Sequence, residues 1–170
     1  VILVAAVIVI LYTLMIMPGV KSNIRSIYSD YLLDLSISYG REMESAMQVN
    51  IDLLDNPEAA QDILQQIDVA GAKTAYAYLV GFDGTMLYHP TAEKIGQPVE
   101  NDAVKKMLKE IQGGSIPKPE TVQYVFQGEK KFAACYTSKK QFILVVTADD
   151  ADLLAPALML EQRGILISGV

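Results

Sequence analysis

The chain has 170 residues, with 14 Lys and Arg, 20 Asp and Glu, and a formal net charge of −6 at pH 7. This length leaves room for one domain of ordinary size and little room for a second core of comparable depth. The acidic balance argues against nucleic acid as a partner, because phosphates call for clustered Lys and Arg. With one Cys and one His the chain lacks an intrachain disulfide and the usual tetrahedral zinc site, and we expect no metal or cofactor.

The first 17 residues carry no charged side chain. An α-helix of that length rises about 26 Å, close to the roughly 30 Å hydrocarbon thickness of a bilayer. We therefore predict a transmembrane helix over residues 1–19. A signal peptide and an apolar core helix are the alternatives. The absence of a basic n-region and the direct continuation into an amphipathic pattern make the signal peptide the weaker interpretation.

An amphipathic pattern follows over residues 20–54, where apolar side chains recur every three or four positions. These are Ile24, Ile27, Tyr28, Tyr31, Leu32, Leu35, Tyr39, Met43, Ala46 and Met47. The spacing predicts a helix of about 50 Å that continues the membrane helix outward. Two shorter helices broken near Gly40 are the alternative. We also expect this helix to form the interface of a homodimer.

Asn56 and Pro57 predict the N-cap and first turn of a short helix. Residues 74–82 then alternate as a strand, followed by a two-residue turn at Asp83-Gly84 and a return strand over residues 85–89 that Pro90 ends. One face of the first strand carries Tyr76, Tyr78, Val80 and Phe82, and the other carries Ala75, Ala77 and Leu79.

Asn101 predicts the N-cap of another helix, which Gly113-Gly114 terminates. Strands over residues 121–126, 131–138 and 141–148 follow, with short turns around Gly128-Glu129 and Lys139-Lys140, which is typical of an antiparallel meander. Apolar residues on both faces predict a sheet covered on both sides. The expected fold is α+β, a PAS-like antiparallel five-stranded sheet with a long N-terminal helix, flanked by transmembrane helices.

A final helix over residues 152–162 leads into a second apolar run from Gly164 to Val170. We expect residues 156–170 to form the exit helix and the start of a second transmembrane helix. All charged side chains lie between Lys21 and Arg163. The chain is therefore predicted to be an excerpt of a multi-pass cell-membrane protein, with residues 20–163 outside the cytoplasm.

The strand Tyr76-Ala77-Tyr78-Leu79-Val80, the turn Asp83-Gly84-Thr85, His89-Pro90 and Ile95-Gly96 together resemble the Cache family of PAS-like sensors. The closing strands around Tyr124, residues 131–136 and Asp149 are similar to that family as well. The resemblance covers residues 20–155. It implies a single extracytoplasmic sensor domain, as in methyl-accepting chemotaxis receptors. A sensor histidine kinase, a diguanylate cyclase and a ligandless dimerisation domain are the alternatives.

In a Cache-like domain the ligand lies between one sheet face and a lid, here residues 90–119. The candidate ligand-binding residues are Tyr76, Tyr78, His89, Tyr124, Tyr136 and Asp149. Tyrosines on strands also serve as half-buried packing residues. His89 is alternatively held by a local hydrogen bond beside Pro90, and Asp149 is alternatively the N-cap of a helix that begins near Ala151.

The ligand class follows from what the chain lacks. A clear Arg and Trp pair like that of the amino-acid-binding double Cache receptors is missing, so small carboxylates are favoured and amino acids remain possible. The sequence also contains no G-x-S-x-G, H-E-x-x-H or phosphate-loop motif. We therefore expect a binding module, not an enzyme, and no catalytic residue.

Overall fold

The computed structural model describes residues 2–49, 53–139 and 141–168. One uninterrupted helix opens the chain, made of α1 (Ile2–Leu11), a π-helical turn (Tyr12–Ile16) and α2 (Met17–Val49). The prediction of a long helix is confirmed up to Val49, and the alternative of a break near Gly40 is wrong. Residues 50–52 of the predicted helix lie outside the described residues.

The strands form one antiparallel sheet in the order β2-β1-β5-β4-β3. The strands are β1 (Tyr76–Gly81), β2 (Met86–Tyr88), β3 (Glu120–Phe126), β4 (Glu129–Thr137) and β5 (Phe142–Asp149). The remaining helices are η2 (Leu53–Asp55), α3 (Pro57–Leu64), η3 (Ala92–Lys94), α4 (Asp102–Gln112), α5 (Asp150–Leu153) and α6 (Ala155–Ser168). This arrangement confirms the α+β class and the PAS-like sheet with its long N-terminal helix.

Asparagine N-caps begin α3 and α4 at the positions that the sequence predicts. The Asn56 side chain accepts hydrogen bonds from the amides of Glu58 and Ala59, and the Asn101 side chain accepts one from the amide of Ala103. Each cap satisfies amides that the first helical turn leaves unpaired. Both predicted N-caps are therefore confirmed.

The turn between β3 and β4 lies one residue earlier than predicted. Phe126 pairs with Glu129, so Gln127 and Gly128 form a two-residue loop with φ values of 52° and 87°. Two successive positive φ values are typical of the type I′ turn that matches the twist of a hairpin. Glu129 is consequently the first residue of β4.

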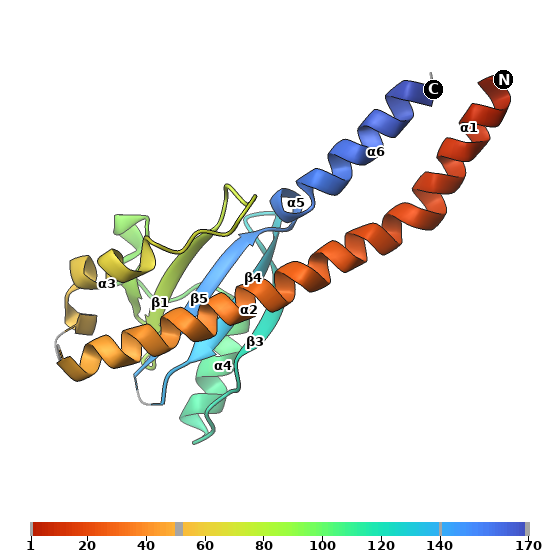
Figure 1. The fold of residues 1–170 in the computed structure, drawn as a ribbon. Helices are drawn as coiled ribbons and strands as arrows, with labels where there is room; N and C mark the ends of the chain where they lie inside the picture. The colour runs from red at the N-terminus through yellow and green to blue at the C-terminus, as the bar shows by residue number, and fades with distance from the viewer. Residues whose placement is uncertain (1, 50–52, 140, 169–170) are drawn as a thin grey trace.

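The two faces of the sheet are covered by different elements. In Figure 1, α2 crosses one face with α3 beside it. The core on that face includes Leu32, Met43, Leu64, Leu79, Tyr136, Phe142 and Leu144. The core on the opposite face joins α4 to the sheet and includes Tyr78, Val80, Val104, Met107, Cys135, Ile143 and Val145. The predicted covering of both faces is confirmed, and α4 leaves part of the second face open.

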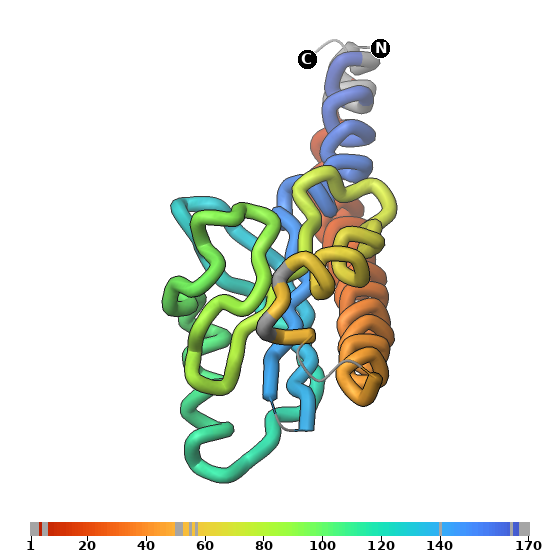
Figure 2. The backbone as a smooth tube through the Cα atoms, turned by 90° about the vertical axis from the view of Figure 1, so that its left-hand side faces the viewer, coloured from red at the N-terminus to blue at the C-terminus, as the bar shows by residue number. Residues whose placement is uncertain are grey.

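The final helix begins at Asp150, two residues earlier than predicted, and Leu154 separates α5 from α6. Helix α6 contacts α1 and α2, and the paired helices project away from the sheet (Figures 1 and 2). Lys21 of α2 and Glu161 of α6 form an ion pair of 2.7 Å where the two helices leave the domain.

Within the described residues, one helix, Val7–Val49, is apolar and long enough to cross a membrane. A signal sequence near an N-terminus has the same properties. Helix α6 does not meet the same criteria, and Gly169 and Val170 lie outside the described residues. Both spans therefore stay predictions.

Candidate functional site

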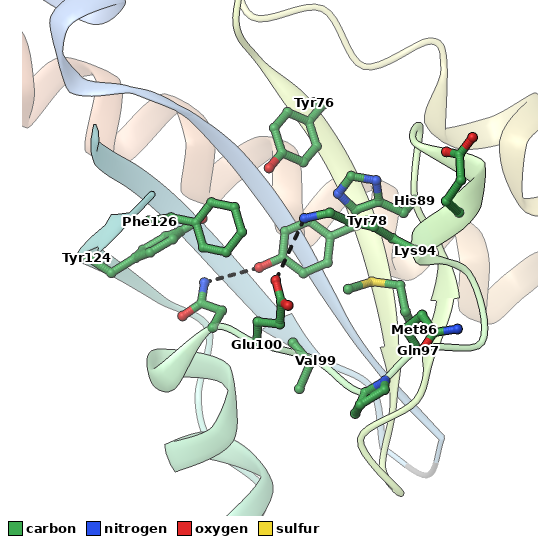
Figure 3. Close-up of a pocket in the computed structure, with 13 residues that line it drawn as sticks. Tyr76, Tyr78, Met86, His89, Lys94, Gln97, Val99, Glu100, Tyr124 and Phe126 are labelled. Carbon is green, nitrogen blue, oxygen red and sulfur yellow. Dashed lines mark hydrogen bonds and ion pairs between the residues drawn. The ribbon is translucent and has the colours of Figure 1, made fainter. Parts of the chain in front are cut away.

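A cleft of about 350 Å³ lies between the open part of the sheet and the segment that connects β2 to α4 (Figure 3). Its lining includes Tyr76, Tyr78, Met86, His89, Glu93, Lys94, Val99, Glu100, Asn101, Tyr124 and Phe126. The structure thus brings together four of the six predicted site residues, Tyr76, Tyr78, His89 and Tyr124. Of the predicted lid, residues 90–119, only side chains between residue 93 and residue 101 line the cleft, and the lid role stays a prediction.

Strand β1 supplies the first two tyrosines, because side chains two residues apart lie on the same face of a strand. The Tyr78 side chain is nearly buried, and its hydroxyl accepts a hydrogen bond of 3.1 Å from Asn101 Nδ2. Asn101 therefore both caps α4 and orients Tyr78. Burial raises the pKa of Tyr78 well above its ordinary value, so the phenol stays neutral.

His89 follows β2 and packs against both tyrosines. Its ring centroid lies 5.2 Å from that of Tyr76 and 5.8 Å from that of Tyr78. Nδ1 accepts a hydrogen bond of 2.9 Å from the Thr91 amide, which is the local bond that the sequence offered as an alternative. The neutral imidazole must then carry its proton on Nε2. Burial and the neighbouring Lys94 lower the pKa of His89, so the ring is neutral at pH 7.

Strand β3 supplies Tyr124 and Phe126 on the opposite side of the cleft. The Tyr124 hydroxyl lies 3.1 Å from Thr147 Oγ1 on β5, and either group can donate. Burial raises the pKa of Tyr124 to about 12. The cleft therefore offers three neutral phenols, one neutral imidazole and an aromatic wall (Figure 3).

Lys94 and Glu100 lie at the mouth of the cleft. Lys94 Nζ is 4.6 Å from the centroid of the Phe126 ring and 3.9 Å from a carboxylate oxygen of Glu100. The second distance marks a loose ion pair, so the ammonium is free to turn towards a bound anion. The sequence did not reveal these two residues because they lie in the connection between β2 and α4, where no periodicity indicates a direction.

A side groove adjoins the cleft and shares Tyr76, His89, Lys94 and Phe126 with it. Asp149 lies in this side groove, not in the cleft. Its carboxylate forms an ion pair with Lys131, the residue directly opposite on β4. Asp149 occupies the N-cap position of α5, but its side chain makes no capping hydrogen bond.

Tyr136 lies on the other face of the sheet, and its predicted place beside the ligand is corrected by the structure. Its ring packs on Gly40 of α2, and its hydroxyl donates a hydrogen bond of 3.1 Å to Glu44 Oε2. Successive residues of a strand point to opposite faces, so Cys135 points to the cleft side and Tyr136 to the helix.

The chemistry of the cleft suits binding. In the part of the chain that the structure describes, no group of three or more His, Cys, Asp or Glu side chains is placed to hold a metal ion. Cys135 is buried beneath the cleft floor, and burial raises its pKa to about 12, which keeps the thiol protonated and a poor nucleophile. A few oriented polar groups within an aromatic pocket are typical of a ligand site.

Neither a family model nor a curated protein sequence matches this chain. Several solved structures are similar to it, among them three extracellular or sensory domains. The extracellular domain of a histidine kinase has a TM-score of 0.48 and 19% identity, with 62% of this chain and 40% of that chain covered. The periplasmic sensory domain of the Campylobacter jejuni chemoreceptor Tlp1 has a TM-score of 0.46 and 19% identity, with 58% and 36% covered.

The third structure is the Escherichia coli DcuS sensor domain, with a TM-score of 0.39 and 16% identity, covering 71% of this chain and 88% of that one. This chain spans well under half the length of the first two domains. All three are extracellular or sensory domains.

Proposed function

We propose that this chain is the small-molecule-sensing part of a bacterial transmembrane receptor of the chemotaxis type. In this proposal residues 20–155 bind a ligand outside the cytoplasm, residues 1–19 form one span, and residues 156–170 lead into a second. The observation that carries the proposal is a cleft lined by β1, whose neighbour in the sheet, β5, runs directly into the exit helix. A sensor histidine kinase or a diguanylate cyclase would use the same arrangement.

The polar groups of the cleft favour a small carboxylate as the ligand. Neutral His89 offers Nε2–H, Tyr76 offers a hydroxyl, and Lys94 offers a positive charge that Glu100 holds only loosely. Hydrogen bonds from such donors to an ionised acceptor are the strong ones. An amino acid would add a cation for Glu93 or Glu100 at the mouth.

A homodimer through α2 belongs to the same proposal. Ile27 of α2 is 67% exposed, and the neighbouring Tyr31 is 36% exposed. Sedimentation of the full chain in detergent would give the mass of two chains if this face pairs, and of one chain if it does not.

Calorimetry on the full chain in nanodiscs tests the proposal. The panel comprises acetate, propionate, pyruvate, succinate and the common amino acids. We expect at least one carboxylate to bind and the His89→Ala variant to weaken it by about tenfold, since a hydrogen bond to a charged group is lost. Tyr136→Phe, a change on the opposite face, serves as the matched control. Heat from none of the compounds, or equal loss in both variants, would contradict the proposal.

A further inference from the structure

The junction between β5 and the exit helix, residues 149–154, is held by carboxylates that each bind a different part of the fold. Asp150 accepts two hydrogen bonds from Arg25 of α2, each 2.7 Å long. Asp152 accepts hydrogen bonds of 2.7 Å and 3.0 Å from the amide and hydroxyl of Thr74, just before β1. Acidic residues in a first helical turn are also favoured by the positive end of the helix dipole.

Asp149 makes a further attachment through the ion pair of its carboxylate with Lys131, while its amide donates a hydrogen bond of 3.0 Å to Thr74 Oγ1. The two residues face each other across β4 and β5, and their side chains are 12% exposed for Lys131 and 23% for Asp149. This pair differs from the Arg25–Asp150 pair because it lies on the ligand side of the sheet. Both of its members line the side groove.

Lys131 also contacts the ligand site itself. Its Nζ lies 5.5 Å from the centroid of the Tyr76 ring, and Tyr76 lines both the cleft and the side groove. An ammonium over an aromatic face is held by a weak attraction that a nearby anion can outweigh. Lys131 therefore stands between a ligand-facing ring and the first residue of the junction.

An anionic group placed beside Tyr76 would weaken the Lys131–Asp149 pair in two ways. It would attract the Lys131 ammonium, and it would add a like charge near the Asp149 carboxylate. A neutral group in the same place would do neither. The Arg25 and Thr74 attachments would remain, including the bond from the Asp149 amide, so the junction would loosen at the Asp149 side chain without detaching from the domain.

Building on the proposed function, we propose that Lys131 is the residue through which the charge of a ligand acts on the exit helix. In the unliganded protein Lys131 holds the start of the junction through Asp149. A bound anion draws Lys131 towards Tyr76 and releases the Asp149 carboxylate, whereas a neutral ligand binds without effect on the junction. A ligand can shift the junction between its paired and released arrangements only if it binds the protein more tightly in one arrangement than in the other.

Hydrogen exchange of the full chain in nanodiscs, read by mass spectrometry, tests this without a ligand. We expect Lys131→Gln to speed exchange in residues 149–154 about fivefold, as for the loss of one part-buried ion pair, while β1 keeps its rate. Lys131→Arg should restore slow exchange, because Arg also pairs with a carboxylate. Lys139→Gln, an exposed change in the β4–β5 turn, should have no effect.

Exchange in residues 149–154 that is unchanged in Lys131→Gln would overturn the inference, as would an equal rise in β1, which reports general destabilisation. A second arm uses succinate, with sodium chloride at the same ionic strength as control. Succinate that binds by calorimetry but leaves the junction at its unliganded rate also overturns it. Absence of binding by every compound counts instead against the proposed function, so the two failures are distinguishable.

Discussion

The two faces of this sheet are built from the same strands and differ in what covers them. On the helix face, α2 and α3 close the surface, and even the polar Tyr136 hydroxyl is engaged by Glu44. On the cleft face, α4 covers one part and leaves Tyr76, Tyr124 and His89 around a cavity. Because side chains alternate along a strand, a shift of one residue moves a tyrosine from the packed helix face to the cleft face.

The largest effect is expected from adding a methyl group at Gly40, where α2 packs on the ring of Tyr136. A Cβ added at Gly40 would lie 2.2 Å from Cδ1 of Tyr136, far inside contact distance. Gly40→Ala should lower the free energy of unfolding by about 3 kcal/mol, the upper part of the range for overpacked cores. Chemical denaturation of the full chain measures this. Gly19→Ala, in the same helix with open space around it, is the control and should not destabilise the protein.

The second prediction compares two hydroxyl deletions on opposite faces. Tyr78→Phe removes the acceptor of the Asn101 hydrogen bond inside the cleft. We expect about 1 kcal/mol loss of stability and about tenfold weaker carboxylate binding. Tyr136→Phe removes the hydrogen bond to Glu44. It should lower stability by no more than Tyr78→Phe does and leave carboxylate binding unchanged. A binding loss in Tyr136→Phe equal to that in Tyr78→Phe would refute the division between the faces.

The third prediction concerns pH and His89. Burial holds the pKa of His89 below its ordinary value of 6.5 in the folded protein. The unfolded chain therefore takes up the proton first, and the unfolding free energy falls as the pH drops below about 6.5. This loss levels off once the folded protein also binds the proton. His89→Gln should remove this dependence between pH 6.5 and 5.5, and a variant that keeps the wild-type pH profile would show that His89 is not its source.

The smallest effect is expected at the pair that ties α2 to the junction. Arg25 donates two hydrogen bonds to Asp150, but its side chain is 37% exposed, so solvent screens the interaction. A double-mutant cycle with Arg25→Gln and Asp150→Asn should give a coupling energy of about 0.5 kcal/mol. A coupling well above about 1 kcal/mol would contradict the screening by solvent and would show that this pair contributes strongly to fixing α2 to the junction.

Local signals predicted most of the fold. The alternation of residues 75–82 assigned both faces of β1 correctly, with Tyr78 and Val80 opposite Ala77 and Leu79. The N-caps at Asn56 and Asn101 depend on a single side chain and its nearest amides, which is why the sequence sufficed. The second bond of Asn101, to Tyr78, joins residues 23 apart and carries no local signal.

Tyr136 shows where more could have been read from the same residues. In a hairpin with a two-residue turn, the residue numbers of every directly opposite pair have the same odd sum. Tyr124, with an even number, must therefore pair with an odd-numbered residue of β4. The structure pairs it with Lys131, which puts Lys131 and Cys135 on its face and Tyr136 on the other. The same rule would have placed Lys131 on the cleft side of the sheet. No such rule applies to Lys94 and Glu100, which lie in the connection between β2 and α4.

His89 is the only histidine of the chain, so its ring signals in an NMR spectrum are assigned without ambiguity. Titrating the full chain with whichever carboxylate calorimetry finds bound tests directly whether the cleft between β1 and β3 is the ligand site. The expected result is a saturating shift of the His89 imidazole signals at the calorimetric affinity, absent in a chloride control. A carboxylate that binds with measurable heat while the imidazole signals stay unmoved would place the ligand elsewhere and contradict the assignment of the cleft.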